Sequence, residues 1–162
     1  MPARILLIDD DTAGLRALSQ VLEPRLDDVA IDTAEDSHAA LDFLRNWEYS
    51  VVVSDIRMPG MDGLALLNQV RERWPHVPVI LMTAMGWNPE AQALHDGAFA
   101  FLEKPIEVER LVALIQAATA KAELRNRVKN ANRQSVHHLD LEASRLDLDI
   151  DPSLKLKRPP KP

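Results

Sequence analysis

The chain has no cysteine, which excludes a disulfide-stabilised protein. It also has no apolar run long enough to cross a bilayer, which excludes a helical membrane protein. Without cysteine there are no disulfides, no thiolate nucleophiles and no cysteine-ligated zinc, which fits a reducing compartment. Near the N-terminus, acidic residues follow the short run "RILLI" directly, and this is not the form of a secretory signal. The formal net charge of −6 disfavours nonspecific binding to nucleic acid. We therefore expect a cytoplasmic protein that binds neither membrane nor nucleic acid.

The first 120 residues alternate short apolar runs with segments of helical periodicity. With 46% hydrophobic residues, the 162-residue chain can fill one core. Several runs are apolar without alternation, which is typical of parallel strands covered on both faces. We therefore predict one α/β domain over residues 1–120, with a doubly wound, five-stranded parallel sheet and five helices. The expected strands lie at 4–8, 29–31, 51–53, 77–82 and 98–102.

The character of the sequence changes after the fifth expected helix. Residues 121–133 contain no helix breaker, and we expect them to prolong that helix. Their apolar side chains have no core to cover, so they either form a homodimer through the last helix or remain solvated. Residues 134–162 run from acidic to basic and proline-rich, which indicates a tail rather than a second core. Either that tail is disordered, or its segment "LDLDID" adds a strand to a partner.

Polar side chains with chemistry of their own follow four of the expected strands. Asp9 and Asp10 follow the first strand, Asp55 the third, Thr83 the fourth and Lys104 the fifth. The carboxyl ends of parallel strands meet at one edge of a sheet, and ligands bind beyond that edge. We therefore expect these five side chains to lie together.

The expected cluster has the composition of a site for magnesium and a phosphoryl group. Crowded carboxylates repel one another and need a cation, and carboxylates with open water positions suit Mg²⁺. Asp55 would attack phosphorus and form an acyl phosphate, while the metal and Lys104 spread the developing charge. A lone aspartate after a strand is more often a turn former or a helix cap, and we assign that role to Asp11. Ser37 is the expected cap of the second helix.

With these residues assembled, the chain resembles the receiver domain of bacterial two-component response regulators over residues 3–120. The motifs that carry the resemblance are "LLIDDD", "VVVSDIRMPGMDG", "VILMTA" and "GAFAFLEKP", in this order. The segments "SDIRMPGMDG" and "FLEKP" are most similar to the receivers of enhancer-binding transcription activators. The resemblance implies a flavodoxin-like fold and a phosphoacceptor rather than an enzyme that turns over a separate substrate.

The resemblance also implies a partner and a metal. Asp55 is then the phosphoacceptor, supplied by the phosphohistidine of a sensor histidine kinase or phosphotransfer protein. Asp10, Asp55 and the backbone carbonyl of Arg57 would bind Mg²⁺ directly, and Asp9 would help through water. The signal would pass to a downstream protein that the sequence does not identify.

Three further residues take roles by the same resemblance. Lys104 would pair with the phosphoryl group, and Thr83 would donate a hydrogen bond to it. Phe101 would be an aromatic switch that turns inward behind Thr83. The Lys104–Pro105 peptide bond is expected to be cis.

Three alternatives compete with a complete receiver protein. In the first alternative, the chain is a receiver fragment of a larger transcription regulator. The ATPase and helix-turn-helix of the enhancer-binding activators have no counterpart after residue 120. Alternatively, it is a small aspartate-nucleophile phosphatase that uses Asp9 and Asp11, although no later strand end supplies the acidic pair which that chemistry needs. The third alternative, a DNA-binding regulator, is supported only by the basic terminal segment "KLKRPPKP". Charged, proline-rich tails of this kind are more often simply solvated.

Overall fold

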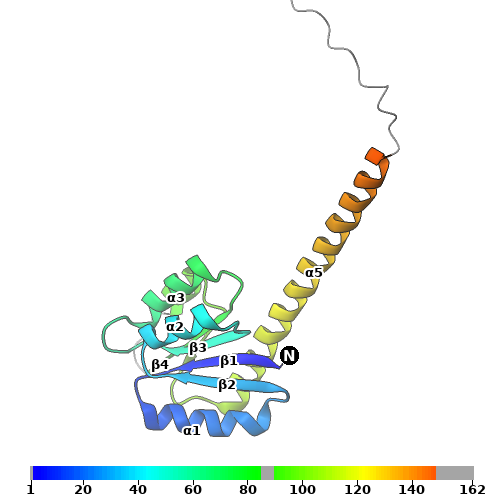
Figure 1. The fold of residues 1–162 in the computed structure, drawn as a ribbon. Coiled ribbons are helices and arrows are strands. Elements are labelled where there is room, and N and C mark those ends of the chain that lie inside the picture. Colours follow the sequence, from blue (N-terminus) through cyan, green and yellow to red (C-terminus); the bar gives the residue numbers. More distant parts are fainter. Residues whose placement is uncertain (1, 85–89, 149–162) are drawn as a thin grey trace, which may run out of the picture. The chain divides into compact units, whose positions relative to one another are not determined.

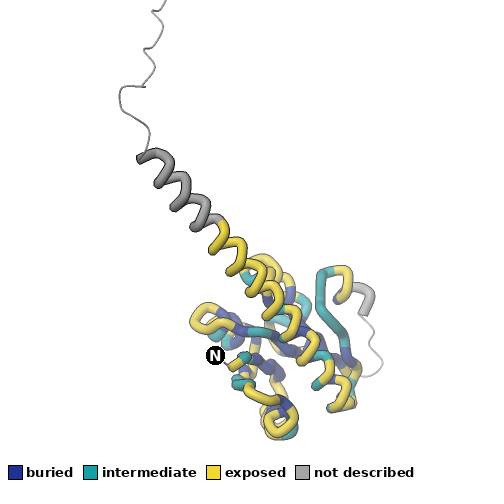
Figure 2. Tube along the Cα trace, turned by 90° about the vertical axis from the view of Figure 1, so that its right-hand side faces the viewer, coloured by how far each residue is buried: buried dark blue, intermediate teal, exposed yellow. Residues whose placement is uncertain are grey.

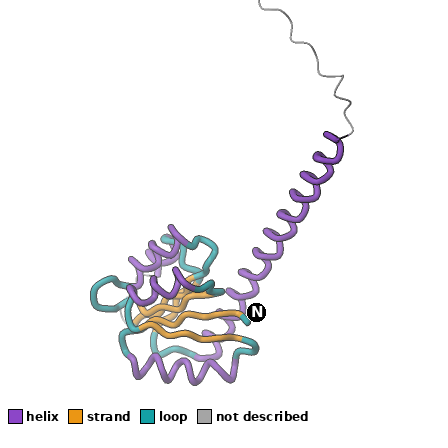
Figure 3. Tube along the Cα trace, in the orientation of Figure 1, coloured by secondary structure: helices purple, strands orange, loops and turns teal. Residues whose placement is uncertain are grey.

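The computed structural model describes residues 2–84 and 90–148, and the chain divides into two units, Met1–Leu124 and Arg125–Pro162. The first unit is a five-stranded parallel sheet with strand order β2-β1-β3-β4-β5 and helices on both faces (Figures 1 and 3). This is the doubly wound fold that the sequence predicts. The strands are β1 (Ala3–Ile8), β2 (Val29–Ala34), β3 (Val51–Asp55), β4 (Val79–Thr83) and β5 (Ala100–Glu103). The helices are α1 (Thr12–Leu22), the 3-10 turn η1 (Glu23–Arg25), α2 (Ser37–Asn46), α3 (Gly63–Arg73), α4 (Glu90–His95) and α5 (Val108–Leu148).

The two faces of the sheet pack into separate cores. On one face, Leu6 and Val52 pack with buried residues of α2 and α3. On the other face, Leu7 and Val53 pack with buried residues of α1 and α5. Every residue of β3 and β4 is buried, which explains why these two strands read as unbroken apolar runs. The sheet is therefore rigid at its centre, and its polar chemistry is confined to the ends of the strands.

Three of the helices begin with an aspartate cap. Asp11 accepts from the Gly14 amide at 3.1 Å and caps α1, as the sequence predicts. Asp36 accepts from the Ala39 amide at 2.8 Å and caps α2, and Asp62 does the same for α3. The prediction that Ser37 caps α2 is wrong. Ser37 is the first helical residue, and its hydroxyl donates instead to the Met61 carbonyl at 2.8 Å.

The last helix continues beyond the first unit. We expected the helical extension to end at residue 133, whereas α5 continues to Leu148, because helix-forming residues such as "LEASRL" follow. All described side chains from 125 to 135 are exposed (Figure 2). Residues 149–162, the second half of the expected tail, lie outside the described residues. Among the described residues, no helix is both long enough and apolar enough to cross a membrane.

Candidate acidic site at the carboxyl edge of the sheet

The predicted site residues meet at the carboxyl edge of the sheet. Asp9 directly follows β1, Asp55 and Thr83 are the last residues of β3 and β4, and Lys104 directly follows β5. The register sets their relative heights, because Ile8 pairs with Ser54 and therefore brings Asp9 level with Asp55. The parallel sheet thus assembles residues that are far apart along the chain.

Lys104 is the cation of this edge. Its Nζ lies 2.8 Å from Asp9 Oδ2 and 3.6 Å from Asp55 Oδ1. Asp9 also accepts from the Asp11 amide at 2.9 Å, so both of its oxygens are engaged. Asp55 accepts from the Ile56 amide at 3.0 Å. The sequence did not predict the direct ion pair between Lys104 and Asp9. By the resemblance, Asp9 would contact Mg²⁺ through water, and Lys104 would pair with the phosphoryl group.

Burial and neighbouring charges raise the pKa values of Asp55 and Lys104. Asp9 is 7% exposed and Asp55 is 6% exposed. Burial raises the pKa of Asp55 above its ordinary value, the Asp9 charge adds to that rise, and the Lys104 ammonium opposes it. Burial also works against the charged form of Lys104, but its hydrogen bond to Asp9 and the negative charges of Asp55 and Asp9 outweigh burial and raise the pKa of Lys104. The edge therefore holds a stably charged ammonium beside a carboxylate that is costly to ionise.

The carboxylates have the composition and spacing of a metal site. Asp9, Asp10 and Asp55 offer oxygens that all lie within 4.8 Å of one another. Asp10 is exposed, whereas Asp9 and Asp55 are buried. Oxygen ligands from a few carboxylates, with room for water, match the preference of Mg²⁺. The donor set therefore fits the expected metal.

Thr83 ends β4 with a fully buried hydroxyl. The residue is 0% exposed, and within the described part of the chain its Oγ1 has no hydrogen-bond partner. A buried hydroxyl without a partner costs free energy, so its retention at the end of a strand points to a ligand that supplies an oxygen.

Arg57 and Phe101 flank the cluster in different ways. Arg57 is exposed and lies in the loop from 56 to 62 between β3 and α3. Phe101 is half-buried in β5 and packs against the core under α2 and α3. Leu81 pairs with Phe101, so Thr83 and Phe101 lie on the same face of adjacent strands. The Lys104–Pro105 peptide bond is cis, as expected.

Asp11 stands apart from the acidic cluster. Its carboxylate caps α1, and the group of three neighbouring carboxylates among the described residues does not include it. The phosphatase alternative needs Asp11 beside Asp9 in the site, so this placement argues against that alternative.

An apolar groove adjoins the site. It has a volume of about 350 Å³ and runs between α1 and the turn that follows β5. Ala17 and Leu18 of α1 face Lys104 and Ile106 across it. The groove therefore offers apolar contact directly beside the acidic cluster.

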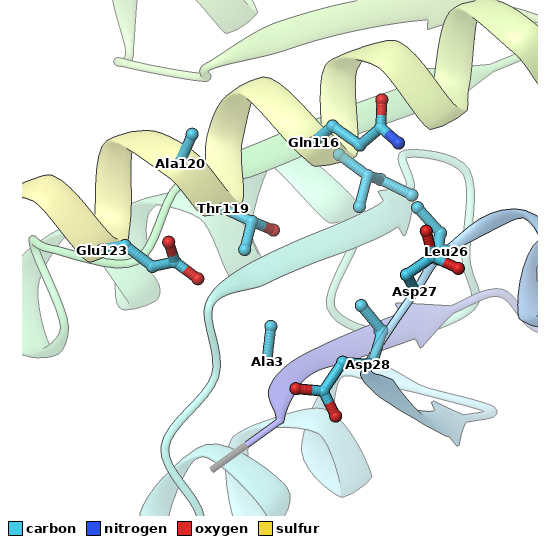
Figure 4. Close-up of a pocket in the computed structure, with 10 residues that line it drawn as sticks. Ala3, Leu26, Asp27, Asp28, Gln116, Thr119, Ala120 and Glu123 are labelled. Carbon is cyan, nitrogen blue, oxygen red and sulfur yellow. The ribbon is translucent and has the colours of Figure 1, made fainter.

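A second cavity lies at the opposite end of the strands. Its volume is about 300 Å³, and Thr119, Ala120 and Glu123 of α5 line one side, with Ala3 and Asp28 on the other (Figure 4). It shares no lining residue with the groove beside the acidic cluster.

A doubly wound sheet with an acidic cluster, a buried hydroxyl and a lysine at its carboxyl edge defines a narrow class of protein. The sequence profile of the response regulator receiver domain matches residues 5–116. The chain belongs to this family.

Relatives and solved structures agree with that membership. Response regulator protein FleR of Pseudomonas aeruginosa is 45% identical over 117 residues, which cover 71% of this chain and 24% of FleR. Transcriptional regulatory protein FixJ of Bradyrhizobium diazoefficiens is 39% identical over 120 residues, covering 74% of this chain and 58% of FixJ. A response regulator receiver domain protein from Clostridium thermocellum superposes with a TM-score of 0.69 at 31% identity, covering 75% of this chain and 98% of that one. The chain thus spans about a quarter of FleR and little more than half of FixJ.

The raised pKa of Asp55 predicts how stability depends on pH. A carboxyl whose pKa is raised by folding makes the folded state lose stability as pH rises from its unfolded pKa, about 3.9, through the raised value. We therefore expect Asp55→Asn to unfold at higher urea concentration than the wild type at pH 7 with EDTA. The two midpoints should converge below about pH 4, where Asp55 is protonated in both states. A difference that stays constant from pH 3 to pH 8 would contradict this explanation.

Proposed function

We propose that the chain is a phosphoacceptor response regulator that takes up a phosphoryl group on Asp55 and signals by binding another protein. The carrying observation is the buried Asp55 carboxylate, 3.6 Å from Lys104 and grouped with Asp9 and Asp10. The donor is the phosphohistidine of a sensor histidine kinase or phosphotransfer protein, and the exchange takes place in the cytoplasm, where ATP charges such kinases.

The proposed transfer is a single displacement at phosphorus. A carboxylate oxygen of Asp55 forms the new bond to phosphorus, and the bond from phosphorus to the imidazole nitrogen breaks and leaves its electron pair on nitrogen. Lys104 leaves Asp9 and pairs with the phosphoryl oxygens, and the Thr83 hydroxyl donates to another of them. The transferred group thereby supplies the partner that the Thr83 hydroxyl lacks among the described residues.

The metal has a defined place in this proposal. Asp10, Asp55 and the carbonyl of Arg57 would hold Mg²⁺, with Asp9 acting through water. When bound, Mg²⁺ supplies positive charge that neutralises the phosphoryl oxygens. The spacing of the three carboxylates supports this assignment.

The same residues link uptake to an output surface. Movement of the Thr83 hydroxyl toward the phosphoryl group vacates space on the face that it shares with Phe101, and the Phe101 ring turns into that space. The coupling free energy of such a switch is typically about 1–3 kcal/mol. The downstream target then reads the changed surface around β5. Since the chain spans only part of the regulators it resembles, the same switch serves equally as the receiver segment of a larger transcription regulator.

Removal of the carboxylate tests the phosphoacceptor. Asp55→Asn should abolish acid-labile phosphorylation by a small phosphodonor with Mg²⁺. Lys104→Ala should slow uptake by roughly a hundredfold, because the developing charge loses a fixed cation. Asp11→Asn is the matched control, since asparagine caps a helix as well as aspartate does and should leave uptake unchanged. Uptake by Asp55→Asn at the wild-type level would refute the assignment.

The groove beside Lys104 is the proposed docking site for the phosphohistidine protein. The groove is largely apolar and adjoins the acidic cluster. The buried core of a protein interface is apolar, so this groove offers a contact surface for the protein that brings the phosphohistidine. Ala17→Arg should therefore slow transfer from a kinase or phosphotransfer protein that serves the wild type by about tenfold. Uptake from a small phosphodonor should not change. Ala117→Arg, on an exposed position of α5 outside the groove, is the control and should affect neither rate. Equal slowing with both donors would place Ala17 in the chemistry rather than in docking.

The extension of α5 supports the proposed homodimer. Leu124 is 64% exposed and Val128 is 53% exposed, and an isolated helix with such residues is marginal in water. Pairing with the same helix of a second chain would bury both. We expect Leu124→Asp with Val128→Asp to convert a dimer to a monomer in sedimentation equilibrium. Asn130→Asp with Asn132→Asp adds the same charge at neighbouring exposed positions and should keep the dimer. A wild type that sediments as a monomer at all concentrations would contradict the homodimer.

A further inference from the structure

Ser37 is a buried residue whose hydroxyl bonds outside its own helix. The residue is 2% exposed at the start of α2, and its hydroxyl donates to the Met61 carbonyl at 2.8 Å. The helix itself is capped by Asp36, so the Ser37 hydroxyl is not needed to begin α2. α2 contributes no side chain to the acidic cluster. Through the Ser37 hydroxyl, α2 is instead connected to the loop that follows Asp55.

That loop, residues 56–62, is fixed at its two ends. At its start, the Ile56 amide donates to the Met82 carbonyl at 2.8 Å, which ties it to β4. At its end, the Gly63 amide donates to the Ile56 carbonyl at 2.8 Å, and a Cβ on Gly63 would lie 2.3 Å from the Asp55 carbonyl oxygen. The glycine is required because its backbone lies directly against that of Asp55.

Between these two ends of the loop, Met61 is held by a hydrogen bond from α2. Its carbonyl accepts from Ser37, and its side chain is half-buried against the core under α2 and α3. Without the Ser37 hydroxyl this carbonyl loses its partner in a part-buried site, so the loop segment would move to recover a hydrogen bond with water. Arg57, whose carbonyl the proposed metal site uses, lies in the same short loop.

We propose that Ser37 is a positioning residue for the acidic site, which it serves by fixing the loop that carries the Arg57 carbonyl. This inference rests on the proposed metal site, to which it adds a residue from a helix remote from the chemistry. A metal ligand supplied by a backbone carbonyl is only as well placed as the loop that carries it, and the supporting bonds determine that placement. Thus Ser37 acts through Met61 and the loop and does not touch the phosphoryl group or the ion.

Two readouts on the full-length chain test the inference. The first is amide hydrogen exchange of residues 57–62 in EDTA, and the second is Mg²⁺ affinity by calorimetric titration. Ser37→Ala should speed exchange in this loop and weaken Mg²⁺ binding by about fivefold, in line with the loss of one hydrogen bond. Ser37→Thr keeps a hydroxyl and should restore both values toward those of the wild type.

Asp36→Ala is the matched control. It removes the cap of α2, so it should lower the melting temperature while leaving loop exchange and Mg²⁺ affinity unchanged. If Asp36→Ala changes both readouts as much as Ser37→Ala does, the effect is general destabilisation of α2 and the inference is overturned. If Ser37→Ala does not fold, Ser37→Cys, which has a similar size and a weak donor, takes its place with the same expectations.

The two readouts also separate this inference from the proposed function. A wild type without Mg²⁺ affinity would refute the metal site, while the exchange measurement in EDTA would still decide whether Ser37 fixes the loop. Wild-type exchange and wild-type Mg²⁺ affinity in Ser37→Ala would overturn the positioning role and leave the metal site standing.

Discussion

Two buried carboxylates beside one lysine are the constraint on which the rest of this molecule depends. Asp9 and Asp55 lie where little water reaches them, and like charges in such a place are costly. Lys104 offsets part of that cost through its short contact with Asp9, and it leaves Asp55 the less compensated of the two. This imbalance of charge agrees with our proposal that the site takes up a metal cation and then a phosphoryl group. In this way an arrangement that is unfavourable for the resting fold becomes favourable for binding.

The fold makes this constraint tolerable by confining it to one edge. Fully buried β3 and β4 leave no freedom at the centre of the sheet, so the strand ends are held in fixed register. Asp11, Asp36 and Asp62 are used as caps of α1, α2 and α3. Among the described residues, the acidic cluster consists of Asp9, Asp10 and Asp55. The loop after Asp55 is held in turn by β4, by Gly63 and by Ser37 of α2.

Much of this could be predicted from the sequence, and the misses have physical causes. β2 continues to Ala34, beyond the apolar run that ends at residue 31, because pairing with β1 carries the polar residues with it. β4 begins at Val79 rather than at residue 77, because Pro78 has no amide hydrogen for the ladder. The role of Ser37 was missed because both serine and aspartate suit a helix start, and only their positions relative to the first turn separate them. The sequence analysis paired Lys104 with the phosphoryl group and missed its ion pair with Asp9. That pair depends on the distance between the two side chains in space, which a sequence motif does not specify.

The sequence by itself determined the order of strands and helices along the chain, the family, and the polar residues at the carboxyl ends of four strands, because all of these follow from local periodicity and motif order. Tertiary structure decided everything that depends on separation in space. It brought Asp9, Asp55 and Lys104 within ion-pair distance, left the Thr83 hydroxyl buried without a partner among the described residues, and set Gly63 against the backbone of Asp55. It also directed the Ser37 hydroxyl to a loop 24 residues away. Such contacts arise from the packing of distant segments, and local sequence patterns carry no record of which distant atoms will meet.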